Sequence, residues 1–241
     1  MNCKTAVVLA AGAGTRMRSE KPKVLHEVCG KPMVSHVTSQ AAEAGADNII
    51  VVIGHGADRV KNAIDDGKLK FAVQSEQLGT GHAVKQAMGD VPDEGGVFVL
   101  CGDTPLITAD TLKGFADFHE KSGNAVTVLT ALFDDPFGYG RIIRAADGSL
   151  LRIVEQKDAN DEEKAVKEVN AGMYCFDAAF LKENISKLSA DNAQKEYYIT
   201  DLIGMAVDSG AGAGAYTVSD ADEIMGVNNR VQLAAAAKVM R

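Results

Sequence analysis

The chain has 241 residues, with 25 lysines and arginines against 33 aspartates and glutamates and a formal net charge of −8. Apolar residues make up 46% of the chain and charged residues 24%, which is typical of a soluble protein long enough to bury a core. The negative charge argues against a nucleic-acid partner, no apolar run reaches the roughly 18 residues of a membrane span, and the missing export signal predicts a cytoplasmic location.

A loop of small residues follows the first predicted strand, residues 5–9, and then becomes strongly basic. Gly12 and Gly14 let the backbone approach a ligand closely, and successive N–H groups can form an anion-binding concavity there. Residues 14–23 carry four basic side chains against one acidic side chain. On an acidic protein this loop indicates a small polyanion such as a phosphate ester. The alternative is an ordinary turn with a solvated basic edge.

The spacing of the glycines excludes two common phosphate-binding loops. No segment fits G-x-x-x-x-G-K-[ST], and in G-x-G-x-x-G counted from Gly12 the third glycine position holds Met17. The loop is therefore neither a P-loop nor a dinucleotide-binding turn.

The first half of the chain alternates apolar strands with helices, which predicts a parallel sheet covered on both faces. In such sheets ligands lie at the carboxyl ends of the strands. The strands are predicted over residues 5–9, 48–53, 71–73, 97–101 and 125–132. The helices are predicted over residues 31–44, 57–64, 83–88 and 108–121.

The second half of the chain no longer alternates strands with helices in the same way, and it predicts a mixed sheet that closes over the first half. A hairpin is expected around the Asp147–Gly148 turn, followed by an exposed charged stretch, residues 156–168. A strand over 169–176, helices over 180–188 and 198–208, a flexible bend over 210–214, a strand over 215–218 and a closing helix over 231–240 complete a single domain.

Polar residues follow two of the predicted strands. Gln74 can both donate and accept hydrogen bonds, which suits the imide edge of a pyrimidine, and Gly79 and Thr80 lie in the same loop. Asp103 follows strand 97–101 directly and is well placed to hold Mg²⁺. The alternatives are a Thr80 helix cap and an Asp-x-Pro turn without chemistry.

Ordered segments along most of the chain resemble the nucleotidyltransferases that join a nucleoside triphosphate to a sugar 1-phosphate. The similarity is greatest to uridylyltransferases that make UDP-N-acetylglucosamine. It implies a Rossmann-like nucleotidyltransferase fold, with a mostly parallel mixed central sheet and a smaller hairpin-containing sugar-binding lobe. The segments are LAAGAGTRM (9–17), PKVLH (22–26), QLGTGHA (77–83), GDTPL (102–106), GYGRI (138–142), IVEQKDA (153–159), NAG (170–172), EYYITD (196–201) and GVNNR (226–230).

The resemblance implies that the chain transfers UMP from UTP to N-acetylglucosamine 1-phosphate (GlcNAc-1-phosphate), with Mg²⁺ as cofactor. The sugar phosphate would attack the α-phosphate in line and pyrophosphate would leave, in a reaction that serves peptidoglycan and lipopolysaccharide synthesis. One alternative is an enzyme of the same fold that uses another sugar 1-phosphate or nucleoside triphosphate. The other is a nucleotide-sugar-binding domain without catalysis.

Carried over residue by residue, the resemblance implies three groups of site residues. The catalytic group is Arg16, Lys23 and Asp103, and Mg²⁺ would be held by Asp103 and Asn228. The nucleotide and its phosphates would contact Leu9, Ala10, Ala11, Gly12, Gly14, Thr15, Gln74, Gly79, Thr80, Cys101 and Gly102. The sugar pocket would be lined by Gly140, Glu155, Asn170, Tyr198 and Thr200.

For four of these residues a plain structural role is the alternative interpretation. Asn228 could cap a helix, Glu155 could be a surface charge, Asn170 could be a turn residue at a strand end, and Tyr198 could lie in the core.

The sequence departs from the resemblance at two places. Cys101 stands where relatives often have tyrosine before Gly-Asp, and its backbone can still make the expected contact. The bifunctional members continue into a left-handed β-helix of hexapeptide repeats that carries acetyltransferase activity and forms a trimer. No such repeat is present before Arg241, so neither acetyl transfer nor the trimer is assigned to this chain. The oligomeric state stays open.

Overall fold

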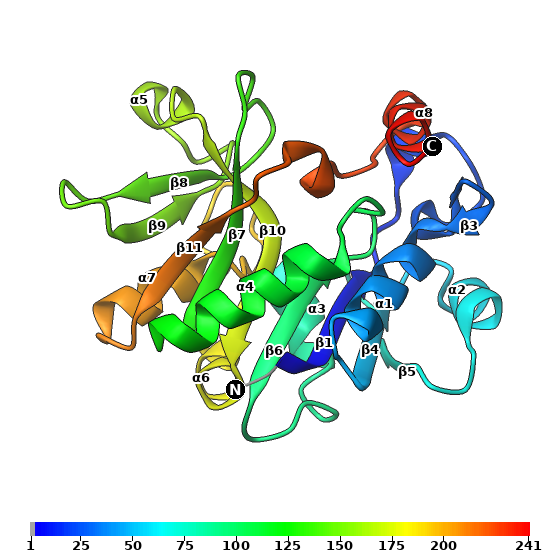
Figure 1. Ribbon diagram of the computed structural model, residues 1–241, viewed down its shortest axis with the longest axis horizontal. Coiled ribbons are helices and arrows are strands. Elements are labelled where there is room, and N and C mark those ends of the chain that lie inside the picture. The colour runs from blue at the N-terminus through cyan, green and yellow to red at the C-terminus, as the bar shows by residue number, and fades with distance from the viewer. Residues whose placement is uncertain (1–2) are drawn as a thin grey trace.

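One nine-stranded sheet runs through residues 3–241, which are the residues that the computed structural model describes (Figure 1). The strand order is β11-β7-β10-β6-β1-β4-β5, and the β8–β9 hairpin is attached through β10. The strands are β1 (Cys3–Ala10), β4 (Asn48–Ile53), β5 (Lys70–Val73), β6 (Gly96–Cys101), β7 (Val126–Leu132), β8 (Arg141–Arg144), β9 (Leu150–Val154), β10 (Glu168–Asp177) and β11 (Ala213–Thr217). A separate two-stranded ribbon joins β2 (Glu27–Val28) and β3 (Lys31–Pro32).

The parallel half of the sheet is as predicted. β1 lies between β4 and β6, and β5 follows β4, with all three pairs parallel; Val7 stands opposite both Ile50 and Val99. The carboxyl ends of these strands therefore meet at one edge, and the loops that follow β1, β5 and β6 are brought together there.

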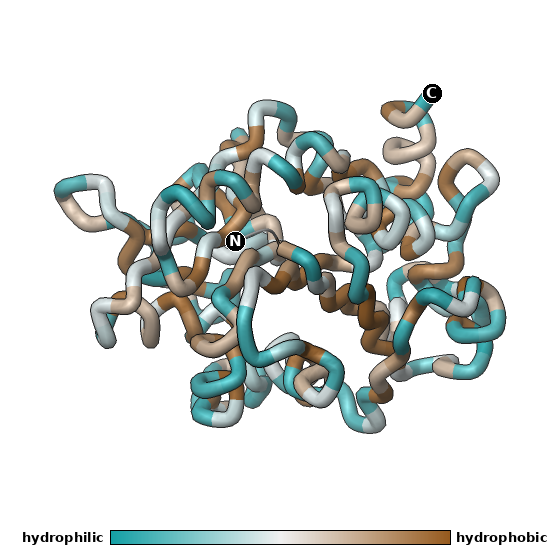
Figure 2. Tube along the Cα trace, turned by 60° about the horizontal axis from the view of Figure 1, so that its bottom comes forward, coloured by the Kyte–Doolittle hydropathy of each residue, from teal (hydrophilic) through white to brown (hydrophobic). Residues whose placement is uncertain are grey.

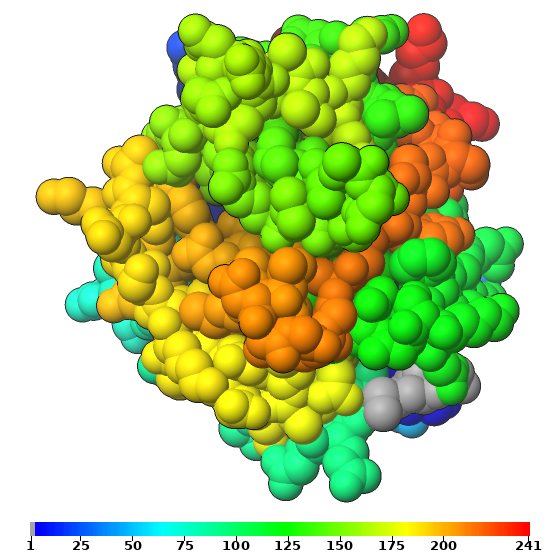
Figure 3. Space-filling model, turned by 90° about the vertical axis from the view of Figure 1, so that its left-hand side faces the viewer, coloured from blue at the N-terminus to red at the C-terminus, as the bar shows by residue number. Residues whose placement is uncertain are grey.

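The second half extends this sheet instead of closing over it, which corrects the expected arrangement. β10 pairs antiparallel with both β6 and β7, with Tyr174 opposite Val99 and Val128, and β11 is parallel to β7. The β8–β9 hairpin branches from the main strand order at β10, and it packs over α7 and β11, as Figure 3 shows from that side. The predicted class, a mostly parallel mixed sheet with a smaller hairpin lobe, is confirmed.

Eight helices lie in the described part of the chain. They are α1 (Met33–Glu43), α2 (Ala57–Ile64), α3 (Thr80–Gln86), α4 (Ala109–Ser122), α5 (Asp161–Lys164), α6 (Ala178–Asn184), α7 (Asp201–Asp208) and α8 (Arg230–Val239). α5 was not predicted; it is a single polar turn closed by a capping box between Asn160 and Glu163. The predicted bend over 210–214 was partly wrong, because β11 already begins at Ala213.

Both faces of the sheet are covered, which explains the unbroken apolar runs in its strands. In β1, Val8 packs in the cluster that contains Phe115 of α4, and Val7 packs on the other face in the cluster that contains Val84 of α3 and Leu202 of α7. Figure 2 shows the hydrophobic stretches gathered in the middle of the molecule and hydrophilic ones around them. Within residues 3–241 no helix combines the length and apolar character needed to cross a membrane.

A third, smaller cluster holds the C-terminal helix beside the beginning of the chain. Val28 of β2, Met33 of α1 and Ala236 of α8 are buried in it together. Arg230 Nε also donates a hydrogen bond of 3.2 Å to the carbonyl oxygen of Met17. The segment that precedes α8 therefore lies beside the glycine-rich loop after β1.

Candidate active site

Two hollows share a wall at the carboxyl ends of β1 and β6. The first hollow, about 270 Å³, lies between the loops after β1 and β5, and the second, about 340 Å³, lies toward the β8–β9 hairpin. Four residues line both: Leu9, Thr80, Cys101 and Asp103. A molecule that extended through both hollows would therefore pass Asp103 near its middle.

The first hollow is shaped by small residues and by the close approach of two segments, the loop after β5 and residues 196–199. At the end of β1 it is lined by the strip of residues 9–12, and Gln74, which is 3% exposed, also lines it. Gly79 has φ +108°, and a Cβ atom there would lie 2.7 Å from the Tyr197 carbonyl oxygen. Glycine is thus required where the loop after β5 packs against residues 196–199.

Four charged or polar side chains from distant parts of the chain converge beside the shared wall. Lys23 Nζ donates to the carboxylate of Asp103 and, over 3.1 Å, to Asn228 Oδ1. Arg16 Nη2 donates to the same Asn228 oxygen over 3.1 Å. The Lys23 and Asp103 side chains are only 15% and 18% exposed, so water screens their attraction weakly. Gly14 permits this packing, because a Cβ there would overlap Lys23 Cβ.

The donors in this cluster fit a hard divalent cation. One carboxylate oxygen of Asp103 and the amide oxygen of Asn228 already meet at a single cation, the Lys23 ammonium. Oxygens of this kind are the ligands that Mg²⁺ prefers. Within residues 3–241 no group of three or more histidine, cysteine or acidic side chains could hold a metal by itself. Two protein oxygens leave room for phosphate oxygens and water in the coordination shell.

The second hollow is polar and partly buried. Thr200 Oγ1 donates to Glu155 Oε1 over 3.4 Å, and burial raises the pKa of the Glu155 carboxyl. Asn170 donates through Nδ2 to the Tyr174 hydroxyl and accepts from the Gly172 N–H, each over 2.8 Å, at an irregularity in β10. Gly140 is close-packed, since a Cβ there would lie 3.1 Å from Ile153. Glu155 is half-buried and not a surface charge, whereas Asn170 keeps part of its alternative role, because its side chain makes a turn contact with the Gly172 N–H where the pairing of β10 breaks.

A comparison with protein families matches residues 6–169 to the MobA-like NTP transferase domain. The chain belongs to this family. Family membership implies a nucleotide substrate and a divalent cation, which the two oxygens of Asp103 and Asn228 are suited to bind.

Curated relatives match this transferase domain along its whole length. The bifunctional protein GlmU of Trichlorobacter lovleyi is 54% identical over 100% of this chain and 53% of its own length. The GlmU proteins of Caldanaerobacter subterraneus subsp. tengcongensis and Clostridioides difficile are 52% and 49% identical, over 98% and 100% of this chain and 51% and 52% of their own lengths. The chain thus spans about half the length of the curated relatives it matches.

A solved structure shares the fold of the transferase domain. It is a Bacillus anthracis protein named as a glucose-1-phosphate thymidylyltransferase, in complex with sucrose, with a TM-score of 0.80 over 98% of this chain and 95% of that chain. The sequences are 19% identical, so this likeness shows the fold alone.

Most of the predicted site residues of the transferase domain line one of the two hollows, and four do not. Gly14 and Thr15 lie in the turn that carries Arg16, and the Gly102 N–H donates to the Leu9 carbonyl over 2.9 Å, which joins the ends of β6 and β1. Tyr198 lies outside both hollows; it is buried, and its hydroxyl is hydrogen-bonded to Asp158 and Gln194. The other predicted residues line the hollows as expected.

The helix caps that were the alternative interpretations of Asn228 and Thr80 are not formed, because neighbouring residues take those places. Asn229, not Asn228, caps α8, with its side chain accepting from the Gln232 N–H over 2.9 Å. Gly79, not Thr80, precedes α3, and Thr80 Oγ1 accepts from the Ile199 N–H over 3.2 Å. Asn228 instead bonds Arg16 and Lys23 and lines the second hollow, and Thr80 lines both hollows.

Sequence reasoning did not single out three aromatic residues that line the second hollow. Phe137 is 77% exposed, Tyr139 packs edge-on against Phe133, and the Tyr174 hydroxyl holds Asn170. Phe137 and Tyr139 flank Gly138 in or beside the quoted GYGRI segment, so proximity to that motif was the available signal. The Cys101 thiol donates to the Gly172 carbonyl over 3.2 Å, and burial raises its pKa to about 12, so the protonated form is favoured.

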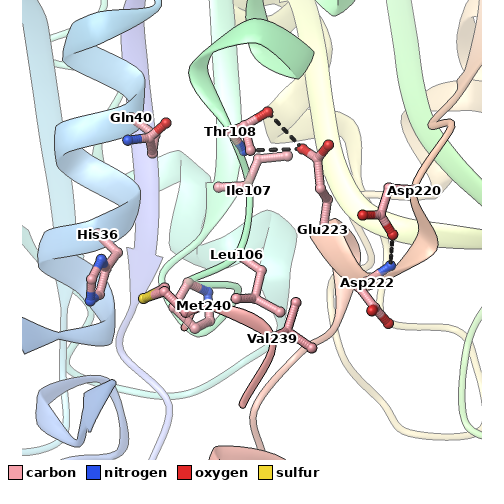
Figure 4. A pocket seen from close by; sticks show the side chains of 11 residues that line it. His36, Gln40, Leu106, Ile107, Thr108, Asp220, Asp222, Glu223, Val239 and Met240 are labelled. Carbon is pink, nitrogen blue, oxygen red and sulfur yellow. Dashed lines mark hydrogen bonds between the residues drawn. The ribbon is translucent and has the colours of Figure 1, made fainter. Parts of the chain in front are cut away.

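A third hollow, about 390 Å³, lies between α1, the loop after β6, the 3₁₀ turn η4 (Ala221–Ile224) and α8 (Figure 4). None of the predicted site residues lines it. Glu223 here accepts hydrogen bonds from the Thr108 N–H and hydroxyl over 3.1 and 2.9 Å, and from the Thr111 hydroxyl over 2.9 Å. These bonds anchor η4 to the start of α4 and so support the segment that leads to Asn228.

Proposed function

We propose that the chain transfers UMP from UTP to GlcNAc-1-phosphate and releases pyrophosphate. The observation that carries this proposal is the convergence of Arg16, Lys23, Asp103 and Asn228 beside the wall that two hollows share. Roughly 50% identity to GlmU proteins over the whole chain and the motif resemblance to uridylyltransferases support the choice of substrates.

UTP would occupy the first hollow. Its base would meet Gln74, Gly79 and Thr80, and its sugar and phosphates would follow the strip of residues 9–12 toward the basic loop. Arg16 and Lys23 would neutralise the triphosphate, and the backbone around Gly14 and Thr15 would hold the departing pyrophosphate. Both cations already lie close to the shared wall, so positive charge is near the place where negative charge develops on the phosphates.

Mg²⁺ would be held by Asp103 and Asn228, beside the wall common to both hollows. When bound, the ion supplies neutralisation of the negative charge on the reacting phosphate. Lys23, which bonds both residues, would then turn toward phosphate oxygens instead.

GlcNAc-1-phosphate would occupy the second hollow, where Gly140, Glu155, Asn170 and Thr200 offer hydrogen-bonding groups to its hydroxyl and acetamido groups. An oxygen of the sugar phosphate would form a bond to the α-phosphorus of UTP while the bond from that phosphorus to the leaving pyrophosphate breaks. No covalent intermediate with the protein is required, so the protein contributes positioning and charge stabilisation.

The test is pyrophosphate release from UTP with GlcNAc-1-phosphate, with and without Mg²⁺, and with glucose 1-phosphate in parallel. The proposal expects metal-dependent release that favours the N-acetylated sugar. Release only with another sugar phosphate or nucleoside triphosphate would overturn the substrates. Absence of release with every pair, despite binding of UDP-N-acetylglucosamine, would support a binding domain without catalysis.

A further inference from the structure

Arg141 buries a positive charge at the base of the β8–β9 hairpin. The residue is 2% exposed, and all three hydrogen bonds that its guanidinium makes within residues 3–241 go to neutral oxygens. The acceptors are the Tyr139 carbonyl, Gln156 Oε1 at 2.8 Å and the Lys164 carbonyl at 3.4 Å. Arg141 Nε is buried without any partner among the same residues. A charge buried in this way costs stability, so its benefit has to lie in the segments that these bonds join.

Arg141 stands at the point where the two strands of the hairpin separate. It pairs with Val154, which is the last residue of β9, and this pair closes the ladder on that side. Beyond the pair, the guanidinium reaches both departing chains, through the Tyr139 carbonyl on one and the Gln156 side chain on the other. A guanidinium presents several donors in a fixed plane, so one side chain can hold both chains at once.

The two departing chains carry residues that line the second hollow. Gly140 lies on one chain and Glu155 on the other, and a Cβ atom at Gly140 would lie 3.5 Å from Glu155 Oε2. Neither Arg141 nor Gln156 lines this hollow or the first one. Arg141 therefore lies behind the wall of the second hollow, where it can place Gly140 and Glu155 without touching a ligand.

The segment of residues 137–140 lines the second hollow and is tied to the same arginine. Phe137 is 77% exposed and Gly138 is exposed too, so packing restrains this part of the wall weakly. The Gly138 N–H donates over 3.0 Å to Gln156 Oε1, the oxygen that also accepts from Arg141. One amide oxygen thus joins the exposed segment to the buried guanidinium.

We infer that Arg141 is a positioning residue for the sugar 1-phosphate and that it acts through Gln156. Together the two side chains fix the wall that residues 137–140 and Glu155 present to the sugar. This inference rests on the proposed function, because it takes the second hollow as the place of the sugar. Displacement of the wall should weaken the contacts with the sugar and leave the nucleotide contacts in the first hollow intact.

The experiment measures equilibrium binding of UDP-N-acetylglucosamine and of UDP to the full chain in the presence of Mg²⁺. UDP reports on the first hollow, and the ratio of the two affinities reports on the sugar. The unaltered protein should bind UDP-N-acetylglucosamine more tightly than UDP. Arg141→Met should lower this ratio about tenfold, the scale of lost hydrogen bonds to a charged group, with UDP binding unchanged. A general loss of structure would instead weaken both ligands alike.

Variants of Gln156 test the route by which Arg141 acts. Gln156→Met removes the shared oxygen and should lower the ratio as Arg141→Met does, whereas Gln156→Glu keeps an acceptor oxygen there and should keep the ratio. The double variant of Arg141→Met and Gln156→Met should be no worse than the weaker single variant, because both changes break one connection. Arg152→Met is the matched control on the same hairpin; its side chain is 59% exposed and pairs with Glu163, and the ratio should not change.

The outcomes separate this inference from the proposed function. A ratio near one in the unaltered protein, an unchanged ratio in Arg141→Met, or equal weakening of both ligands would overturn the role of Arg141. The proposed function would still stand if the unaltered protein releases pyrophosphate from UTP and GlcNAc-1-phosphate. A lowered ratio in Arg141→Met without that release from the unaltered protein would support Arg141 and contradict the proposed function. If Arg141→Met does not fold, equal ratios in Gln156→Met and Gln156→Glu would overturn the inference.

Discussion

Lys23 is the residue on which the charges of the site converge. Its ammonium pairs with Asp103 and Asn228 in a region where both lysine and aspartate are largely shielded from water. We predict that Lys23→Ala lowers the turnover number about 10²-fold or more, the scale for a preorganised electrostatic partner of a transition state. Steady-state pyrophosphate release measures it. Lys21→Ala is the control, because Lys21 forms an exposed pair with Glu27 and should be dispensable. Near-normal turnover of Lys23→Ala would remove Lys23 from the mechanism.

Glu155 shows how a site residue can reduce the stability of the fold. Burial raises the pKa of its carboxyl above the ordinary value of 4.5, against the opposing hydrogen bond from Thr200. Below pH 4.5 the carboxyl is protonated in both the folded and the unfolded protein, and no cost arises. Between pH 4.5 and the raised pKa of the folded protein, the carboxyl is ionised in the unfolded state and still protonated in the folded state. The free energy of unfolding therefore falls as pH rises through this range.

Glu155→Gln should therefore have a higher urea midpoint than the unaltered protein at pH 7, with a difference that disappears as pH falls toward 4.5. The reason is that glutamine keeps the shape and the Thr200 contact but cannot ionise. Urea titrations at several pH values measure the effect, with the exposed Glu162→Gln as control. A difference that stays constant with pH would show that ionisation of Glu155 is not its origin.

At the scale of elements, the sequence predicted the parallel half of the sheet well because each strand there is buried on both faces. Val7 and Val8 belong to opposite core clusters, so the whole run of β1 has to be apolar. The pairing of β10 was not predictable in the same way. Antiparallel insertion between β6 and β7 depends on partners 36 to 81 residues away along the chain, and nothing in the local pattern of residues 168–177 specifies them.

The candidate site, like the sheet, was only partly predictable from the sequence. Loops after buried strands could be placed from the sequence, since carboxyl ends of parallel strands meet at one edge, and this brought Gln74 and Asp103 together. The resemblance implied that Tyr198 and Thr200 both belong to the sugar pocket, but only Thr200 lines the second hollow, whereas the Tyr198 hydroxyl is hydrogen-bonded to Asp158.

At the scale of the whole molecule, the site depends on the two ends of the described chain lying side by side. Asn228 reaches Arg16 and Lys23 because α8 is fastened to β2 and α1 by a small cluster around Ala236, separate from the two large clusters on the faces of the sheet. Activity and global stability should therefore respond differently when this cluster alone is disturbed.

Ala236→Asp tests this dependence. The side chain of Ala236 is fully buried, and a carboxylate there could escape desolvation only by moving α8 off β2. We predict a loss of about tenfold or more in pyrophosphate release, because Asn228 would leave Lys23 and Asp103. The midpoint of thermal unfolding should fall by no more than a few degrees, since both large clusters stay intact. Val231→Asp on the same helix is the control, because Val231 is 79% exposed and can carry a charge in water. Equal losses of activity in both variants would mean that the charge on α8, and not the docking of the helix, sets the rate, whereas a large fall in the midpoint for Ala236→Asp would show that α8 is part of the folding core.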